Sequence, residues 1–210
     1  MKNGESIMKE LDYDKLMHIK TGDLKNQPSV RLFQYHRYEP TPYSALEVLF
    51  EHYEVSRSDH VVDFGCGLGR LNFYIHHFYH ASVTGIEMNK DFHEMAMENL
   101  ENFQKKMKGH PDQIQFYHCL AEEYDIKESD NRFYFFNPFS IHIFRKIVHK
   151  ILGSLEQNWR EADIILYYGH DDYVQFLENE TPFELLEEVK IPELYERNPY
   201  ERFLIYRVAG

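Results

Sequence analysis

The sequence has few cysteines, few basic residues and no long apolar run. It contains only two cysteines, Cys66 and Cys119, among 210 residues. Two cysteines give neither a disulfide framework nor a cysteine-based metal site and are typical of a reducing compartment. No stretch approaches the roughly 20 apolar residues that cross a bilayer, and the N-terminus lacks the apolar region of a signal peptide. We therefore expect a cytoplasmic protein with no membrane partner.

Lysine and arginine are outnumbered, with 23 basic against 35 acidic residues and a net charge of −12. An acidic chain repels a phosphate backbone unless its basic residues cluster. Duplex DNA and long RNA are therefore disfavoured as partners. The exception is a dense basic and aromatic segment from Arg31 to Tyr38, which is suited to hold an anion or a base. An ordinary mixed surface segment accounts for the same pattern.

The length and composition predict one domain. A chain of 210 residues with 43% hydrophobic content suffices for a single α/β core and is too short for two ordinary domains. We expect an N-terminal arm over residues 1–40, acting as a lid, a substrate contact or a packed arm, and one domain over residues 41–210. The pattern does not distinguish a monomer from an oligomer.

Three glycines lie at alternate positions in one short segment. Residues 61–70 read VVDFGCGLGR, so a β-branched pair and Asp63 precede Gly65, Gly67 and Gly69, and a helical pattern follows at once. The pattern predicts a strand, a tight turn and a helix. Glycine permits positive φ and a close approach of ligand to backbone, while free amides at a helix start favour polar or negative groups. The segment therefore predicts a small-ligand site.

The spacing of these glycines indicates which ligand. It matches neither the G-x-G-x-x-G of dinucleotide sites nor the G-x-x-x-x-G-K-[ST] of P-loops. The next predicted strand ends at Glu87, 24 residues after Asp63. In a βαβ unit, an acid about 20 residues beyond the glycine turn is placed to accept from both hydroxyls of a ribose. The spacing therefore favours an adenosine-containing ligand.

Strands and helices alternate along most of the chain. The pattern predicts strands over 60–64, 82–87, 113–118, 132–137 and 163–168, helices over 69–79, 90–106 and 141–155, a helix starting at Thr41-Pro42, and two last strands over 183–192 and 200–208. This rhythm is typical of a parallel sheet with helices on both faces. Ligands of such sheets bind at the carboxyl ends of the strands, where the glycine turn belongs.

Residues 63–69, DFGCGLG, resemble motif I of the class I S-adenosylmethionine-dependent methyltransferases. The resemblance covers roughly residues 41–208. It implies an α/β fold with a Rossmann-like seven-stranded sheet, mostly parallel with an antiparallel C-terminal strand, and S-adenosylmethionine as cofactor. It further implies that Asp63 lies near the amino-acid end of the cofactor, that the backbone of Gly65, Cys66 and Gly67 passes beneath it, that Glu87 binds the ribose, and that Met88 contacts the adenine.

The segment after the third predicted strand departs from this family. Members carry an acid followed by alanine there, and the acid accepts from the adenine amino group. In this chain Leu120 stands in place of the acid. The resemblance then leaves the Ala121 amide and the Glu122 side chain to frame the ring.

Residues 133–140, FYFFNPFS, resemble motif IV, which in amino-methylating members reads Asn-Pro-Pro followed by an aromatic residue. It implies that Asn137 and the Pro138 carbonyl accept hydrogen bonds from the target amine, with Asn137 also beside the cofactor. Phe139 and Ser140 depart from the motif, and simple strand termination by Asn-Pro is the alternative. If the acceptor must lose a proton, His142 is the candidate base; a helix-surface histidine is the alternative.

We therefore predict a methyltransferase enzyme that transfers a methyl group to a small-molecule or undetermined acceptor. One alternative is an N-methyltransferase for an adenine or amide nitrogen of nucleic acid or protein, and another is a non-catalytic regulatory protein that binds S-adenosylmethionine. His76, His77 and His80 lack an acidic third ligand, so we assign them to a solvated helix face and predict no metal site.

Overall fold

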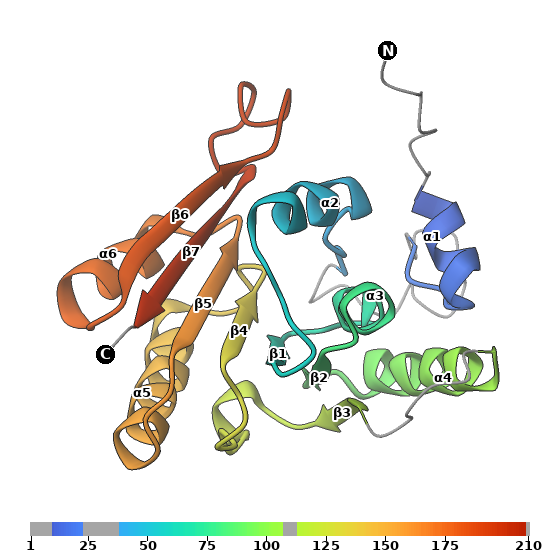
Figure 1. Cartoon of the computed structure of the whole chain (residues 1–210), viewed down its shortest axis with the longest axis horizontal. Coiled ribbons are helices and arrows are strands. Elements are labelled where there is room, and N and C mark those ends of the chain that lie inside the picture. Colours follow the sequence, from blue (N-terminus) through green and yellow to red (C-terminus); the bar gives the residue numbers. More distant parts are fainter. Residues whose placement is uncertain (1–9, 23–37, 107–112, 209–210) are drawn as a thin grey trace.

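The computed structural model describes residues 10–22, 38–106 and 113–208, which form one sheet flanked by helices (Figure 1). The sheet has seven strands in the order β3-β2-β1-β4-β5-β7-β6. The strands are β1 (His60–Phe64), β2 (Ser82–Glu87), β3 (Ile114–His118), β4 (Arg132–Phe135), β5 (Ala162–Tyr167), β6 (Glu184–Lys190) and β7 (Arg202–Val208). Strands β1 to β5 pair in parallel, and β7 is antiparallel to both β5 and β6. The predicted fold is confirmed.

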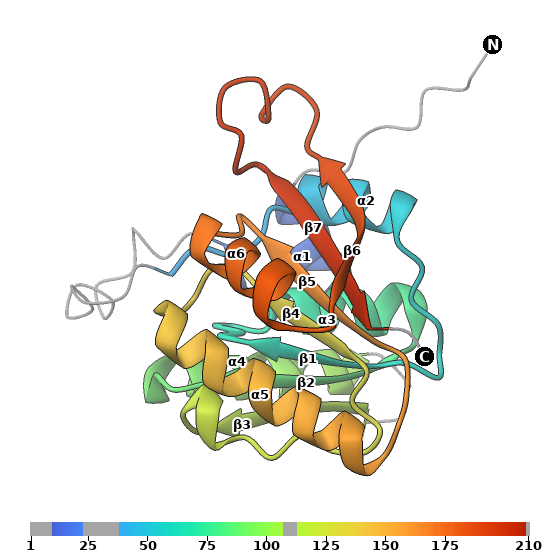
Figure 2. The ribbon, with the colours of Figure 1, turned by 90° about the vertical axis from the view of Figure 1, so that its left-hand side faces the viewer.

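Helices cover both faces of the sheet (Figures 1 and 2). One face carries α1 (Glu10–Met17), α2 (Tyr43–His52), α3 (Arg70–Tyr79) and α4 (Lys90–Lys106), and the other carries α5 (Ile141–Gln157) and α6 (Asp171–Glu180). Successive strand side chains point to opposite faces. Accordingly Tyr134 of β4 joins the core under α2 and α3, while its neighbour Phe133 joins the core under α5. The strands are therefore buried on both sides, as parallel sheets usually are.

Some element boundaries differ from the sequence-based expectation. β4 ends at Phe135, two residues early, because the chain turns out of the ladder and Asn137 adopts a φ of 40°. Helix α6 was not predicted, because only Tyr173, Phe176 and Leu177 mark its buried face within a run of acidic residues. The assignment of His76 to a solvated face is wrong: it is buried, with Nδ1 3.1 Å from the Ala81 carbonyl oxygen.

The N-terminal helix belongs to the same core as α2. Tyr13 of α1 stacks on Tyr43 of α2 with ring centroids 4.5 Å apart, and Met17 is fully buried. Of the predicted basic and aromatic segment, only Tyr38 falls within the described residues. In the part of the chain that the structure describes, every helix is too short or too polar to cross a membrane.

Candidate functional site

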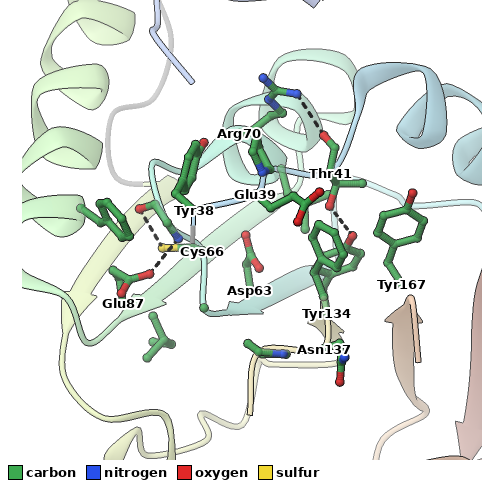
Figure 3. Close-up of a pocket in the computed structure, with 18 of the residues that line it drawn as sticks. Tyr38, Glu39, Thr41, Asp63, Cys66, Arg70, Glu87, Tyr134, Asn137 and Tyr167 are labelled. Carbon is green, nitrogen blue, oxygen red and sulfur yellow. Dashed lines mark hydrogen bonds between the residues drawn. The ribbon is translucent and has the colours of Figure 1, made fainter. Parts of the chain in front are cut away.

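A cavity of about 540 Å³ opens at the carboxyl ends of β1, β2, β4 and β5. This volume is within the range of about 300–1,000 Å³ that is usual for small-ligand sites. Most of the residues predicted to bind cofactor or substrate line it: Asp63, Gly65, Cys66, Gly67, Glu87, Met88, Ala121, Asn137 and Pro138. Figure 3 shows Glu87 at one side of this cavity, Tyr167 at the other, and Asp63 between them.

The glycine turn and the end of β2 form one hydrogen-bonded unit. The backbone N–H of Gly67 donates to Glu87 Oε2 at 2.9 Å, and the N–H of Asn89 donates to Glu87 Oε1 at 2.7 Å. Gly67 has a φ of 54°, and a Cβ there would lie 2.6 Å from the Tyr38 ring. Only glycine fits this position without strain. The turn therefore fixes the Glu87 carboxylate at the cavity wall.

Asp63 is a second buried carboxyl group, only 4% exposed. In the orientation that satisfies both neighbours, the Asn72 side-chain nitrogen donates to Asp63 Oδ2 at 3.0 Å and its oxygen accepts from the Gly85 N–H at 3.2 Å. Burial, and next the charge of Glu87, raise the pKa of Asp63 to about 8. Asp63 therefore favours a cationic partner, whose charge would restore its ionised form.

Cys66 is packed as a small residue within the turn. A Cβ on the neighbouring Gly85 would lie 2.7 Å from Cys66 Sγ, so the thiol fills the space against β2. Burial first, and then the charges of Asp63 and Glu87, raise the pKa of the thiol well above its usual value. The thiol therefore stays protonated, which agrees with the expectation that it is not a nucleophile.

Arg70, the first residue of α3, joins the N-terminal segment to the glycine turn. Its guanidinium donates to Thr21 Oγ1 at 2.9 Å, to the Thr21 carbonyl at 3.0 Å and to the Thr41 carbonyl at 3.2 Å, and it pairs with Glu10 at 2.5 Å. Tyr38 donates to the same Thr21 carbonyl at 2.9 Å. The segments immediately before and after residues 23–37 are therefore held together beside the cavity.

Aromatic side chains form the far end of the cavity, around Asn137. Tyr134 and Thr41 hydroxyl oxygens lie 2.7 Å apart, and the Tyr167 hydroxyl donates to Glu201 Oε2 at 2.6 Å. The Phe136 and Tyr167 ring centroids are 4.7 Å apart. This end therefore combines flat apolar faces with a carboxylate.

Two predicted site residues lie away from the cavity. Glu122 directs its carboxylate to Lys146, 3.7 Å away, while its carbonyl accepts from Lys150 at 3.0 Å. His142 is exposed on the first turn of α5. Neither is among the lining residues, whereas Ala121 is buried at the cavity wall.

Several lining residues carried no sequence signal of their own. Glu39, Tyr167 and Glu201 belong to no motif. Tyr167 and Glu201 come together because β7 pairs with β5, and Glu39 lines the same cavity from the segment before α2. Arg70 had one signal, its place immediately after the third glycine. Among the described residues, no group of three or more His, Cys, Asp or Glu side chains is arranged to hold a metal ion.

Comparisons with known proteins address the fold. No protein-family model and no curated protein sequence matches the chain. Solved structures do match it. An RNA methyltransferase from Salinibacter ruber, crystallised with S-adenosyl-L-homocysteine, is 20% identical with a TM-score of 0.56, and the match covers 80% of this chain and 92% of that one.

Two further structures widen the comparison. A candidate RNA methyltransferase from Pyrococcus horikoshii is 20% identical with a TM-score of 0.55, covering 94% of this chain and 96% of that one. Geranyl diphosphate C-methyltransferase from Streptomyces coelicolor is 10% identical with a TM-score of 0.54, covering 79% and 77%. These enzymes share an architecture while acting on different substrates. The chain therefore has the Rossmann-like class I fold of the S-adenosylmethionine-dependent methyltransferases.

Proposed function

We propose that this protein is an S-adenosylmethionine-dependent methyltransferase. One observation carries the proposal. The Gly67 N–H donates a hydrogen bond to Glu87 at the wall of a cavity that Asp63 and Asn137 also line. The fold supports it, since solved structures with this fold were crystallised with S-adenosyl-L-homocysteine.

The cavity residues fit such a cofactor chemically. Gly65 is exposed at the cavity, so a ligand can approach its backbone closely, whereas Gly67 is buried against the Tyr38 ring and shapes the turn. A carboxylate has about four acceptor positions, so Glu87 can bind ribose hydroxyls while it holds the turn. Asp63 would hold the ammonium of the amino-acid end, with Met88 and Ala121 beside the adenine.

S-adenosylmethionine supplies a methyl group activated by a sulfonium. The chain's part is to position the acceptor, and orientation alone provides on the order of 7 to 11 kcal/mol in favourable cases. Asn137 and the Pro138 carbonyl would accept hydrogen bonds from the acceptor, and the aromatic end of the cavity would exclude water. An acceptor that is already nucleophilic requires no dedicated base, and the exposed position of His142 offers no support for one.

We propose a small-molecule acceptor. The acidic lining supports this proposal, because a polyphosphate would meet the carboxylates of Glu39 and Glu201 at the cavity. The alternative, methylation of an adenine or amide nitrogen in nucleic acid or protein, is favoured by Asn137-Pro138.

We regard residues 41–210 as the catalytic unit and residues 1–40 as an arm that contributes Tyr38 and Glu39. A cytoplasmic location stays a prediction from the low cysteine content.

Two measurements test the proposal. Calorimetry on the purified full chain should detect S-adenosylmethionine and S-adenosyl-L-homocysteine in the micromolar range; no binding to folded protein would sink the proposal. Methyl-labelled S-adenosylmethionine is then incubated with the protein and a source-cell lysate divided into small-molecule, RNA and protein fractions. Label in the small-molecule fraction supports a small-molecule acceptor, and label sensitive to nuclease or protease supports methylation of nucleic acid or protein. Binding without any transfer would favour a regulatory protein.

A further inference from the structure

The end of the cavity beyond Asn137 is built from three aromatic rings. Phe136 lies at the end of β4, while Tyr167 and Tyr168 lie at the end of β5. The centroid of Phe136 is 4.7 Å from that of Tyr167 and 6.3 Å from that of Tyr168. Tyr167 is fixed by stacking on Phe203 at 4.5 Å, and Tyr168 accepts a hydrogen bond from the Asn198 side chain. The rings are therefore held in place as a wall.

Carboxylates accompany these rings. Glu201 Oε2 accepts from the Tyr167 hydroxyl at 2.6 Å, and Glu39 lines the same part of the cavity (Figure 3). Burial, and next Glu201, raise the pKa of Tyr167, with a further contribution from Glu39. Tyr167 thus stays a neutral donor that orients Glu201. This end of the cavity carries negative charge beside electron-rich ring faces.

In the part of the chain that the structure describes, no unengaged basic side chain faces this end of the cavity. Among the described residues that line the cavity, Arg70 is the one basic side chain. Its guanidinium is already engaged by Glu10, Thr21 and Thr41. A phosphate or carboxylate at the aromatic end would face Glu39 and Glu201 without a compensating charge, whereas a cation would gain both ion pairing and cation–π contact.

We infer that this end of the cavity, formed by Phe136, Tyr167, Tyr168, Glu39 and Glu201, binds the methyl acceptor through an amine. The inference rests on the proposed function and specifies its substrate class. The acceptor binds as an ammonium and first gives one proton to Glu201 or Glu39, and Glu39, which is exposed, passes it to water. The neutral nitrogen then uses its lone pair to bond the methyl carbon while the carbon–sulfur bond breaks and leaves its electron pair on sulfur. The methylated nitrogen is again a cation.

The test measures binding apart from turnover. Full-length protein saturated with S-adenosyl-L-homocysteine is titrated in a calorimeter with four probes of similar shape: 2-phenylethylamine, trimethyl(2-phenylethyl)ammonium, the neutral 2-phenylethanol and the anionic 3-phenylpropanoate. We expect the two cations to bind at least about tenfold more tightly than the alcohol, and the acid to bind most weakly.

Two variants assign the effect to the named residues. Glu201→Gln should weaken both cations about tenfold and leave the alcohol and S-adenosyl-L-homocysteine within about twofold, because only the charge is removed. Phe136→Leu should also weaken the cations, because the ring face is lost. Glu196→Gln, an exposed glutamate in the same connection between β6 and β7, is the matched control and should change nothing.

The outcomes distinguish failure of the amine site from failure of the proposed methyltransferase function. Failure of S-adenosyl-L-homocysteine to bind removes the proposed function itself. If it binds but the cations bind no better than the alcohol, or Glu201→Gln leaves them unchanged, the amine site is wrong. Methyl transfer confined to an RNA fraction would likewise overturn the amine site while leaving the methyltransferase intact.

Discussion

The backbone N–H of Gly67 donates to the carboxylate of Glu87 across 2.9 Å. This bond joins the turn after β1 to the end of β2, two neighbouring parallel strands. It fixes the Glu87 carboxylate beside the glycine turn at the wall of the cavity. The two residues that the sequence singled out separately therefore act as one unit, and a change at either should disturb both.

Gly67→Ala should weaken cofactor binding and destabilise the protein. Gly67 has a φ of 54°, and the added methyl would lie 2.6 Å from the Tyr38 ring. We expect a loss of about 2–4 kcal/mol in the free energy of unfolding from backbone strain and overpacking. Affinity for S-adenosyl-L-homocysteine should fall more than about tenfold, because the turn that holds Glu87 must shift. Urea denaturation and calorimetry measure the two effects.

Gly153→Ala is the matched control. A Cβ at Gly153 meets nothing within 4 Å, and the residue lies within helix α5. Alanine there should stabilise the protein by about 0.5–1 kcal/mol through helix propensity, with unchanged affinity. Equal losses in the two variants would mean that the position of Gly67 has no special role.

Asp63→Asn should stabilise the protein in a pH-dependent way. The folded-state pKa of Asp63 is about 8, against about 3.9 for an unfolded chain. The folded state therefore holds this proton more tightly, so stability falls as pH rises from about 4 to about 8. Asparagine carries no proton to lose. The variant should match the original protein near pH 4 and exceed it in urea midpoint near pH 8, and a constant difference would contradict this account.

The same variant should bind the cofactor less tightly. Loss of the carboxylate removes the group that we propose as partner of the cofactor's ammonium, and we expect affinity to fall about 10- to 100-fold. In the original protein at pH 7, binding should release a proton, because a cation favours ionised Asp63. Calorimetry in two buffers of different ionisation enthalpy measures this release, which should disappear in Asp63→Asn.

Local sequence patterns predicted that the glycine turn and the end of the next strand lie together. The three glycines and the acid at the end of the next strand are separated by one βαβ unit, whose geometry is nearly fixed by strand pairing. Gly65, Gly67 and Glu87 were therefore predicted from spacing alone, and they line one cavity. The strand and helix alternation likewise predicted the sheet, because buried parallel strands read as apolar runs.

The aromatic end of the cavity, where we propose that the methyl acceptor binds, depends on contacts between distant segments. Glu201 meets Tyr167 across 34 positions of sequence, through antiparallel pairing of β7 with β5. No local periodicity encodes that register. His142 shows the opposite failure: proximity in sequence to Asn137 suggested a shared site, but the first turn of α5 presents it to solvent. Helix α6 was missed because its three buried residues stand among acidic ones.

Arg70→Lys should destabilise the protein more than the same substitution does at an exposed arginine. The guanidinium donates to Thr21 through two nitrogens and reaches Thr41 with a third contact. Lysine is a single point charge and cannot reproduce this planar set of donors. We expect a loss of about 1–3 kcal/mol in the free energy of unfolding, measured by urea denaturation. Arg57→Lys, an exposed position, is the control and should differ by less than about 0.5 kcal/mol.

Asn137→Gly separates turn geometry from chemistry. Asn137 has a φ of 40°, a conformation that glycine adopts without strain, so the variant should be as stable as the original or up to about 1 kcal/mol more stable. Its affinity for S-adenosyl-L-homocysteine should stay within about twofold. Loss of the Asn137 side-chain amide should lower kcat by about 100-fold, because the nitrogen of the methyl acceptor is no longer oriented.

Asn137→Ala completes the comparison, because it removes the same amide and restores strain at the positive φ. It should lose about 1 kcal/mol of stability and show the same fall in kcat as Asn137→Gly. The decisive measurement is therefore methyl transfer by the glycine variant. If Asn137→Gly transfers methyl at the original rate, Asn137 serves only to end β4, and the acceptor must be oriented by the aromatic rings and carboxylates beyond it.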